Sequence, residues 1–425
     1  MHITLKYLKF FLFIAISINI LFYYFKPTLY ELRLNIDKYT QRNISQNQGL
    51  HKLVLIMIKK ATFFLPKYDQ VELKKDIIDV GVGLYITPPP RFDSKNIYVQ
   101  TADEIVTAIS TSLPNTIINI LPGHYKFSGK SIKFKSSGKQ FEPIILKADT
   151  LGEVIFEMDL YEGIIISTSY IKIENIIFKG IKNKTDSQEH AIHLTKNADF
   201  VEIAHNEFIN FNAHIKSNGV FTKDGVNHFP DNVVITHNNF YNQWKRNTRS
   251  PSIPIDVVGG NNWVIKNNFI ADFGKYGKKG EGITYGLYLK GAGKNGLIEN
   301  NLVACEWQVP HTSPNDVRIG ISLGGGGTGK RYCMDKTCNY EHNGGVIRNN
   351  TIVNCKNDVA IYINKGKNTK IYSNYIVNSL GIDIRFPSSS ADIYDNYLDG
   401  RIKARQGAKL NKSNNQKSKE YLGGS

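Results

Sequence analysis

Lys290, Arg318 and Tyr288 are the side chains of this sequence best suited to acid–base chemistry. A lysine beside arginines has its pKa lowered by the like charges, so its amine can serve as a base, while an arginine can bind a carboxylate. Tyr288 is an alternative base, or an acid that protonates a leaving group. His193 and Asp256 could bind the substrate or serve as the acid. This chemistry requires that residues far apart in the sequence share one surface.

Six short segments of alternating apolar and polar residues would create that surface. They are AIHLT (191–195), PIDVV (254–258), GLYLK (286–290), GISLG (320–324), AIYIN (360–364) and GIDIR (381–385). Successive side chains of a strand point to opposite faces, so Ile192 and Leu194 would point inward. The outward face then carries His193, Asp256, Tyr288, Lys290, Ser322, Tyr362, Asn364, Asp383 and Arg385, with Arg318 at the same parity as Ser322. If these strands stack in parallel, neighbours lie ~4.8 Å apart.

We predict that part of this face and one flanking loop bind substrate. The predicted binding residues are His193, Asp256, Ser322, Tyr362, Asp383 and Arg385 on the face, and Trp244 and Arg246 in the loop 244–250. The glycine run Gly324–Gly327 leaves bare backbone against which a polymer could lie. The alternative for each charged residue is a solvated face, and Tyr362 and Asp383 could simply pair with neighbours across strands.

A repeat of about 22 residues or more underlies these segments. An apolar strand, an asparagine and a second apolar strand recur from IKIENIIF to DIYDNYL, with spacings from 22 (Asn374 to Asn396) to 49 (Asn300 to Asn349) residues. We expect the asparagines of the repeat to stack at one bend: Asn175, Asn206, Asn238, Asn267, Asn300, Asn349, Asn374 and Asn396. Variable insertions between short strands are typical of a solenoid. The predicted fold is all-β, a right-handed single-stranded parallel β-helix of the pectate-lyase type.

The chain divides into four predicted parts. Residues 1–30 form a membrane anchor, 31–96 a helical stalk or linker with an amphipathic segment, 97–400 the β-helix, and 401–425 a basic flexible tail. Thr101 and Glu104 form a capping box that predicts a short helix over 102–113 at the start of the β-helix.

The N-terminal run 10–25 (FFLFIAISINILFYYF) contains no charge and is flanked by lysines. It favours an uncleaved transmembrane helix ending in an aromatic belt, with a cleaved signal peptide or a buried soluble helix as alternatives. Residues 50–65 carry charges and favour an amphipathic helix on the membrane or a core helix of a small stalk. The predicted location is the inner (cytoplasmic) membrane, spanned once, with the main domain periplasmic or otherwise extracytoplasmic.

Composition restricts the partners. The chain has 53 Lys and Arg against 37 Asp and Glu, a formal net charge of +16 over 425 residues. Such a charge predicts an anionic partner. That partner could be nucleic acid, lipid headgroups or an acidic polysaccharide, and charge alone does not choose among them. Nucleic acid is the weakest of these because no nucleic-acid-binding module is recognisable. Among four cysteines, Cys333 and Cys338 are a predicted disulfide of an oxidising compartment, and Cys305 and Cys355 are expected to be buried or paired.

Two stretches resemble the right-handed parallel β-helix polysaccharide lyases of the chondroitinase B and alginate lyase group. FEPIILKADTLGEVIFE is similar to the opening coil of that group. GLYLKGAGKNGLIENNLV with VRIGISLGG is similar to the coils that carry its catalytic lysine and arginine. The resemblance implies that Lys290 is the base and that Arg318 neutralises the substrate carboxylate.

The chain departs from the pattern of this group at the calcium site. Acidic residues shortly before the lysine bind calcium in the group, but Ile283 and Tyr285 stand at those positions here, and Gly291 replaces the serine after the lysine. We therefore predict no metal site and no cofactor, with calcium as the open alternative. Without a metal, a lysine or arginine must neutralise the carboxylate.

The preferred function is β-elimination on a uronate-containing polysaccharide by a membrane-anchored protein. A non-catalytic glycan-binding or assembly subunit of a membrane polysaccharide synthesis or export complex, with a membrane protein as partner, is the first alternative. A C5-epimerase is the second, although the Asp-Pro-His-Asp motif of alginate epimerases is absent. A glycoside hydrolase is disfavoured because Asp256 and Asp383 lie four rungs apart, ~19 Å at the strand spacing, too far for a carboxylate pair.

Overall fold

The computed structural model describes residues 93–181, 189–222, 227–277 and 280–417. These ranges all belong to the second of two compact units, Val71–Ser425. The predicted anchor and the amphipathic segment lie outside the described residues. Within the described ranges, no helix has the length and apolar character needed to span a bilayer.

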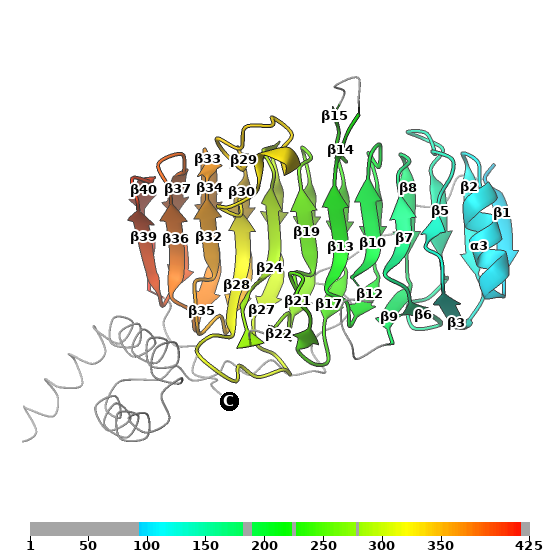
Figure 1. The fold of residues 1–425 in the computed structure, drawn as a ribbon, viewed down its shortest axis with the longest axis horizontal. Helices are drawn as coiled ribbons and strands as arrows, with labels where there is room; N and C mark the ends of the chain where they lie inside the picture. Colours follow the sequence, from blue (N-terminus) through cyan, green and yellow to red (C-terminus); the bar gives the residue numbers. More distant parts are fainter. Residues whose placement is uncertain (1–92, 182–188, 223–226, 278–279, 418–425) are drawn as a thin grey trace, which may run out of the picture. The chain divides into compact units, whose positions relative to one another are not determined.

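Three long parallel sheets form the body of this unit, as the repeat predicted (Figure 1). Each complete coil contributes one strand to each sheet, and β1 and β40 extend the first sheet by one strand at either end. Strands inside a sheet pair with their counterparts in the preceding and following coils. This is the architecture of a parallel β-helix, because every sheet contains strands far apart in sequence.

The first sheet has twelve strands and the other two have ten each. The first contains β1 (Lys95–Val99), β2 (Thr116–Ile120), β5 (Ile144–Lys147), β8 (Ile171–Glu174), β11 (Glu202–Ala204), β16 (Val234–Thr236), β20 (Val264–Lys266), β26 (Leu297–Glu299), β30 (Val346–Arg348), β34 (Thr369–Tyr372), β37 (Ser390–Tyr394) and β40 (Lys409–Ser413). The second, here called the ladder sheet, contains β4 (Ile132–Lys133), β7 (Glu162–Ile166), β10 (His190–Thr195), β13 (Ala213–Asn218), β19 (Ile255–Val258), β24 (Ile283–Lys290), β28 (Val317–Leu323), β32 (Ile361–Asn364), β36 (Gly381–Arg385) and β39 (Arg401–Arg405). The third contains β3 (Gly123–Ser128), β6 (Val154–Asp159), β9 (Ile177–Gly180), β12 (Glu207–Ile209), β17 (Asn239–Tyr241), β21 (Phe269–Ala271), β27 (Leu302–Ala304), β31 (Thr351–Val353), β35 (Tyr375–Val377) and β38 (Tyr397–Leu398).

Short strands in the connecting loops complete the structure. They are β14 (Val220–Phe221) with β15 (Asn227–His228), β18 (Arg246–Asn247) with β22 (Lys275–Gly277) and β23 (Gly280–Glu281), and β25 (Gly293–Lys294) with β29 (His342–Asn343) and β33 (Gly366–Lys367). A single 3₁₀ turn, η2, spans Lys330–Tyr332 within the described residues.

The helix α3 (Ala102–Thr111) lies at the N-terminal end of the β-helix, as predicted from its capping box (Figure 1). The Glu104 amide donates to the Thr101 hydroxyl oxygen at 3.2 Å, and the Gln100 amide donates to the Glu104 carboxylate at 2.8 Å. Ile105 and Ile109 point into the core and are fully buried. The helix therefore covers apolar surface that the first coil would otherwise expose.

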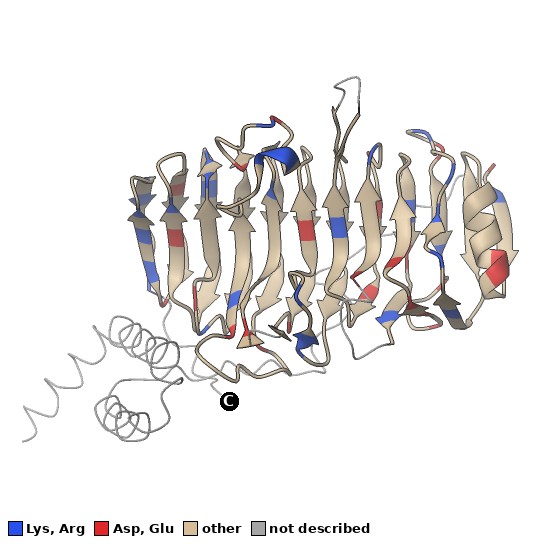
Figure 2. Cartoon of the chain, viewed as in Figure 1, with Lys and Arg blue, Asp and Glu red and all other residues tan. Residues whose placement is uncertain are grey.

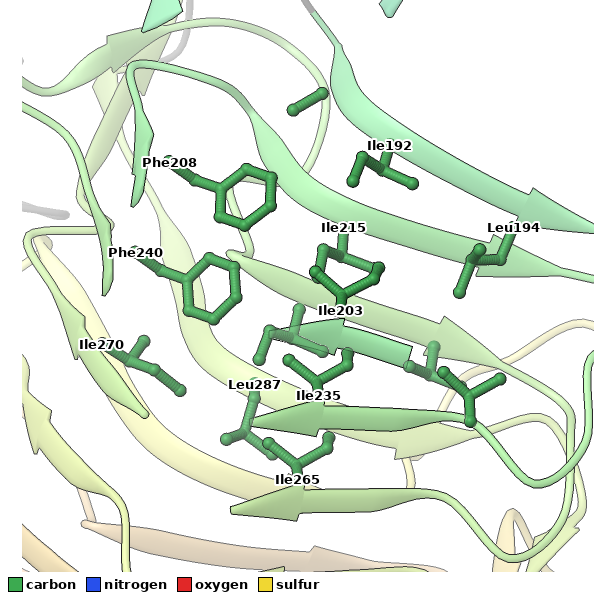
Figure 3. Close-up of a cluster of buried hydrophobic side chains, with 14 of the residues drawn as sticks. Ile192, Leu194, Ile203, Phe208, Ile215, Ile235, Phe240, Ile265, Ile270 and Leu287 are labelled. Atoms are coloured by element: carbon green, nitrogen blue, oxygen red, sulfur yellow. The ribbon is translucent and has the colours of Figure 1, made fainter. Parts of the chain in front are cut away.

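The core between the sheets consists of stacked apolar side chains. Phe156, Phe178, Phe208 and Phe240 follow one another along the third sheet, with neighbouring ring centroids 4.8–5.5 Å apart. Figure 3 shows Phe208 and Phe240 facing isoleucines of the other two sheets. Full burial of each such side chain stabilises the fold by about 1.5–3 kcal/mol.

A ladder of asparagines stacks at one bend, but at a position partly different from the prediction. Asn301 is typical: its side-chain amide donates to the carbonyls of Ile265 and Glu299, and its main-chain amide donates to the side-chain oxygen of Asn350. The buried ladder contains Asn206, Asn238, Asn268, Asn301, Asn350, Asn374 and Asn396.

Four of the eight predicted ladder members instead occupy the residue before it. Asn175, Asn267, Asn300 and Asn349 have φ of 54–62°. Asparagine is one of the few residues that tolerate this left-handed conformation. After Asn267, Asn300 and Asn349 the next residue is also an asparagine, so either of the two could have filled the stacked position. After Asn175 the next residue is Ile176, and the ladder begins one coil later.

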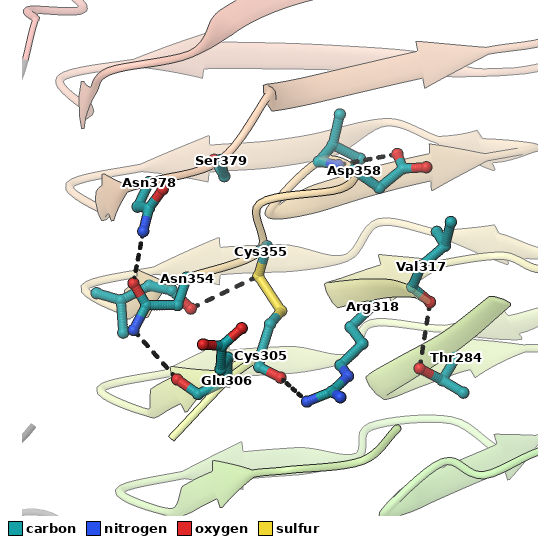
Figure 4. Close-up of a disulfide and its surroundings, with 12 residues drawn as sticks. Thr284, Cys305, Glu306, Val317, Arg318, Asn354, Cys355, Asp358, Asn378 and Ser379 are labelled. Carbon is teal, nitrogen blue, oxygen red and sulfur yellow. Dashed lines mark hydrogen bonds between the residues drawn. A yellow bond between two sulfur atoms is a disulfide. The ribbon is translucent and has the colours of Figure 1, made fainter. Parts of the chain in front are cut away.

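Both cysteine pairs form disulfides. Cys333 pairs with Cys338, as predicted, and Cys305 pairs with Cys355, so all four cysteines of the chain are bonded. The Cys305–Cys355 bond joins neighbouring coils just after β27 and β31, with a Cα–Cα distance of 4.9 Å (Figure 4).

Part of the predicted flexible tail belongs to the β-helix, which corrects the boundary at residue 400. Strands β39 and β40 extend the ladder sheet and the first sheet through residues 401–413. Strand β39 alternates cationic and apolar residues, whereas β40 (KLNKS) has Leu410 as its one apolar residue. Ile402 and Leu410 pack against the core. The positive charge of both segments concealed their place in the β-helix.

Candidate active site

The strand register shows that six residues of the predicted face share one row across the ladder sheet: His193, Asp256, Tyr288, Ser322, Tyr362 and Asp383. Each member lies opposite the next on the neighbouring strand, in the order His193, Lys216, Asp256, Tyr288, Ser322, Tyr362, Asp383 and Lys403. Lys290 belongs to the next row, opposite Val258, and Asn364, Arg385 and Arg405 form a run of that row on the C-terminal strands.

Lys216, Asp256 and Tyr288 form the centre of this row. The Lys216 ammonium lies 2.7 Å from the Asp256 carboxylate, which is 5% exposed. Burial opposes ionisation of Asp256, yet the charges of Lys216 and Lys290 hold its pKa below the ordinary value. Burial and the adjacent Asp256 charge raise the pKa of Tyr288 well above that of a free phenol. Tyr288 therefore stays protonated near neutral pH, which removes it as a base.

Lys290 lies over this centre. Its Nζ is 4.3 Å from the centroid of the Tyr288 ring, a cation–π contact. Burial lowers the pKa of Lys290, the charge of Lys216 adds to this effect, and Asp256 opposes it. The side chain remains partly exposed. A partly exposed lysine with a lowered pKa can act as a general base.

The glycine run after β28 approaches Lys290 closely. A Cβ on Gly324 would lie 1.8 Å from the Asn364 carbonyl oxygen, so only glycine fits. A Cβ on Gly325 would lie 3.1 Å from Cδ of Lys290 and 3.2 Å from the Glu341 carboxylate. Glu341 is fully buried and accepts from the Gly325 amide at 2.7 Å and the Thr328 amide at 3.2 Å. These bonds fix bare backbone beside the lysine.

Ser322, predicted to bind substrate, supports that backbone instead. Its side chain is fully buried, and its Oγ lies 2.7 Å from the Gly324 carbonyl and 2.9 Å from the Tyr362 carbonyl. Because the side chain is fully buried and bonded to these carbonyls, Ser322 cannot contact a ligand.

The structure does not place Arg318 beside Lys290, which corrects its predicted role. Arg318 pairs with Thr284 at the far end of the strand pair, six residues before the level of Lys290, ~20 Å at the strand rise. It is fully buried, bonds Asp316 through Nε and Nη2 at 3.0 and 2.7 Å, and donates to the Cys305 carbonyl at 2.9 Å (Figure 4). Arg318 thus fixes the loop between Cys305 and Asp316, and its guanidinium cannot reach a substrate carboxylate.

His193 lies at the N-terminal end of the row with both ring nitrogens occupied. Nδ1 is 2.7 Å from a Glu162 carboxylate oxygen, and Nε2 is 2.5 Å from the Asn218 side-chain oxygen. Both ring nitrogens of His193 therefore have hydrogen-bond partners within the protein. The bond from His193 lowers the pKa of Glu162. His193 is partly exposed and remains a candidate for substrate binding.

At the C-terminal end of the row, the predicted residues pair with one another. Asp383 accepts from Arg405 Nε at 2.7 Å, and the Tyr362 hydroxyl accepts from Arg405 Nη2 at 2.8 Å and Arg385 Nη1 at 3.4 Å. Tyr362 and Asp383 are nearly buried, so the partly exposed Arg385 and the exposed Arg405 are the groups that a ligand would meet.

Arg246 is not part of this face, whereas Trp244, two residues before it, is partly exposed. Arg246 is fully buried, its Nε donates to Asn212 at 3.2 Å, and burial lowers its pKa to about 10. Strand β18, which carries Arg246, pairs with β22 in a separate small sheet. The guanidinium of Arg246 therefore cannot contact a ligand on this face.

Sequence reasoning missed three groups of the site. Lys216 lies in HIKSN, which has the same alternation as the six recognised segments, so the signal was present. Arg405 lay in the segment assigned to a flexible tail. Glu341 follows the disulfide loop, and no local pattern connects it with the glycine run.

The described residues contain no group of three His, Cys, Asp or Glu side chains arranged to hold a metal. At the positions that would match the calcium ligands, the exposed Ile283 and the half-buried Tyr285 carry no carboxylate.

The comparisons with known proteins agree with the sequence resemblance. The chondroitinase B family model matches residues 99–309, which confirms the resemblance to β-helix polysaccharide lyases over that part of the chain. No curated protein matches the chain.

Several solved structures are similar to the chain at low identity. An alginate lyase from Paenibacillus sp. str. FPU-7 has 13% identity and a TM-score of 0.46, over 78% of this chain and 96% of that chain. A mannuronic acid specific family 6 lyase from human gut microbiota has 16% identity and a TM-score of 0.43, over 76% and 78%. A GH136 lacto-N-biosidase from Eubacterium ramulus has 10% identity and a TM-score of 0.47, over 76% and 68%.

Proposed function

We propose that this protein cleaves a uronate-containing polysaccharide by β-elimination, with Lys290 as the base. The observation that carries the proposal is the position of Lys290: partly exposed, with a lowered pKa, and beside a bare glycine backbone. The family match to chondroitinase B supports the reaction class.

In the proposed reaction, the neutral Lys290 amine removes the C5 proton of a uronate. The C4–O bond breaks, a double bond forms between C4 and C5, and the proton passes from Lys290 to the departing glycosidic oxygen. Lys216, two rungs along the ladder, supplies the positive charge that stabilises the developing charge on the carboxylate. It takes the role that the sequence assigned to Arg318. Tyr288 keeps Lys290 in place through its ring face.

The proposal is tested by incubating the full-length protein with polymers of mannuronate, guluronate, galacturonate, glucuronate and iduronate. Elimination produces unsaturated uronate ends that absorb ultraviolet light. A flat trace with every polymer would refute the proposal for these substrates. A C5-epimerase would instead exchange the C5 hydrogen with solvent without shortening the chain.

A glycan-binding or assembly subunit is the second candidate, and one observation favours it. The two carboxylates of the row already pair with cations: Asp256 with Lys216 and Asp383 with Arg405. A surface of satisfied charges suits reversible binding. In that case the variant Lys290→Met should bind polyuronate as well as the wild type, with affinity that falls with salt.

We also propose that residues 1–30 anchor the protein in the inner membrane, with the β-helix outside the cytoplasm. The apolar run in the sequence supports the anchor, and two disulfides fit an oxidising compartment. Cell fractionation tests this: recovery of the full-length protein in the soluble fraction would refute the anchor.

A further inference from the structure

A groove of about 710 Å³ lies on the C-terminal coils, apart from the Lys290 site. Strands β34, β37 and β40 and the turn 387–389 form its walls. Lys367, Lys370 and Lys409 line it, together with Tyr340, Ser388 and Ser390. The C-terminal strands of the unit also carry Lys and Arg at several other positions (Figure 2).

The lysines of the groove are free to meet a ligand. All three are exposed, and none forms an ion pair with a carboxylate among the described residues. The one acidic side chain of the lining, Asp392, accepts from the Asn411 amide at 2.9 Å. Three lysines against one carboxylate make the groove positive.

The rest of the lining suits a sugar polymer. Ser388 and Ser390 provide hydroxyl groups, Asn411 an amide, and Tyr340 a partly exposed ring. Hydroxyl and amide groups bond to sugar hydroxyls, and a tyrosine presents an apolar ring with a polar end. Lysines add attraction for carboxylates.

Direct contacts connect this groove with the Lys290 site. Gly325 lies against Lys290, and the next residue, Gly326, lies against Phe386, whose ring would be 2.9 Å from an added Cβ. Pro387, the residue after Phe386, belongs to the groove lining. A chain leaving Lys290 across the glycine run would pass Phe386 and enter the groove.

Phe386 is held in an unusual conformation at this junction. Its φ is 83°, a region that bulky residues rarely occupy. The Arg385 guanidinium lies 4.7 Å from its ring centroid and the Lys365 ammonium 6.0 Å. Strain of this kind persists where the surroundings enforce it, and it often marks a ligand site.

We infer that the groove lined by Lys367, Lys370 and Lys409 is a second subsite, which holds the same acidic polysaccharide beyond the Lys290 site. The inference rests on the proposed function for the identity of the ligand. It predicts that long chains bind across both sites, whereas short fragments occupy only the Lys290 site.

The test compares two triple variants of equal charge. The groove variant is Lys367→Gln, Lys370→Gln and Lys409→Gln. The control is Lys130→Gln, Lys135→Gln and Lys196→Gln, which removes three exposed lysines on the N-terminal half of the β-helix. Binding of the polymer from the panel that binds the wild type most tightly is measured by calorimetry at several salt concentrations, in full-length protein carrying Lys290→Met.

The groove variant should bind the polymer at least 10-fold more weakly than the control, with a smaller salt dependence, and both should bind tetrasaccharides equally. With Lys290 intact, KM for the polymer should rise in the groove variant while kcat stays unchanged. Equal polymer binding by the two variants would overturn the inference, as would an oligonucleotide that displaces the polymer from the groove at equal charge concentration.

The readouts separate the two proposals. Loss of polymer binding in the groove variant without any elimination by the wild type would refute the lyase and leave the subsite standing. If the groove variant performs elimination and matches the control in polymer binding and KM, the subsite is refuted and the lyase proposal stands.

Discussion

The ammonium of Lys290 lies 4.3 Å from the centroid of the Tyr288 ring, and Tyr288 is opposite Asp256 in the strand register. The phenol therefore separates a cation from the anion that would stabilise it. Burial lowers the pKa of Lys290 and raises that of Tyr288, so the two groups are driven toward their neutral forms. This relationship supports the proposed role of Lys290 as the base, with Tyr288 holding it in place.

The pH dependence of elimination should follow Lys290. Its neutral form is the base, so kcat rises with pH toward a pKa that lies below the ordinary 10.5. The Asp256 charge raises this pKa and the Lys216 charge lowers it. We therefore expect Asp256→Asn to move the acid limb of the kcat profile to lower pH and Lys216→Met to move it to higher pH. Shifts of both variants in one direction would contradict the assignment.

Replacing Arg318 should damage stability rather than chemistry. The variant Arg318→Met leaves Asp316 buried without its guanidinium partner and frees the carbonyls of Cys305 and Val309. Breaking a buried pair in this way costs about 3–5 kcal/mol. Thermal unfolding should show a markedly lower Tm, and the protein that stays folded should keep its kcat. A large loss of kcat at unchanged Tm would restore the catalytic role.

The two disulfides should differ in their contribution to stability. The pair Cys305–Cys355 closes a loop with a sequence separation of 50 residues, and Cys333–Cys338 one of 5. Loop entropy alone gives about 4 kcal/mol for the first and about 2 kcal/mol for the second. We expect urea unfolding to show a larger loss for the double Ser variant of Cys305 and Cys355 than for that of Cys333 and Cys338. The opposite order would disprove the entropic account.

The adjacent residues Asn300 and Asn301 provide a test of the stacked asparagines at the bend. Asn301 is buried and bonds both neighbouring coils, whereas Asn300 sits in the left-handed position with φ of 54°. Asn301→Ala leaves several main-chain groups unpaired, at about 1–3 kcal/mol each. Asn300→Gly keeps a residue that tolerates the conformation and should change stability little. Comparable losses of unfolding free energy in both variants would show that the ladder is misassigned.

The fold could be predicted from the sequence because each coil repeats the same local pattern. Alternation placed the polar residues of the second sheet on one face, and the strand register confirms a row of them from His193 to Asp383. Parity says which face a residue occupies, however, and not whether a neighbour buries it. Ser322 and Arg318 have the predicted parity, but bonds to the glycine run and to the Cys305 loop remove them from the surface.

The sequence pattern also does not give the register, that is, which residue of the neighbouring strand lies opposite a given residue. Arg318 and Ser322 belong to one strand, and only pairing with β24 shows that Arg318 faces Thr284 rather than Lys290. Contacts made by loops, such as that of Glu341 with Gly325, depend on how insertions fold back over the sheet. No local pattern in the sequence encodes them.

The most direct test of the account is the ultraviolet absorbance produced by three full-length proteins on the polyuronate panel: the wild type, Lys290→Met and Lys266→Met. Lys266 is a partly exposed lysine on another sheet and serves as the matched control. We predict unsaturated ends with the wild type and the control, and a rate lower by a factor of about 10² or more for Lys290→Met. Full activity of Lys290→Met beside an active wild type would contradict the central claim.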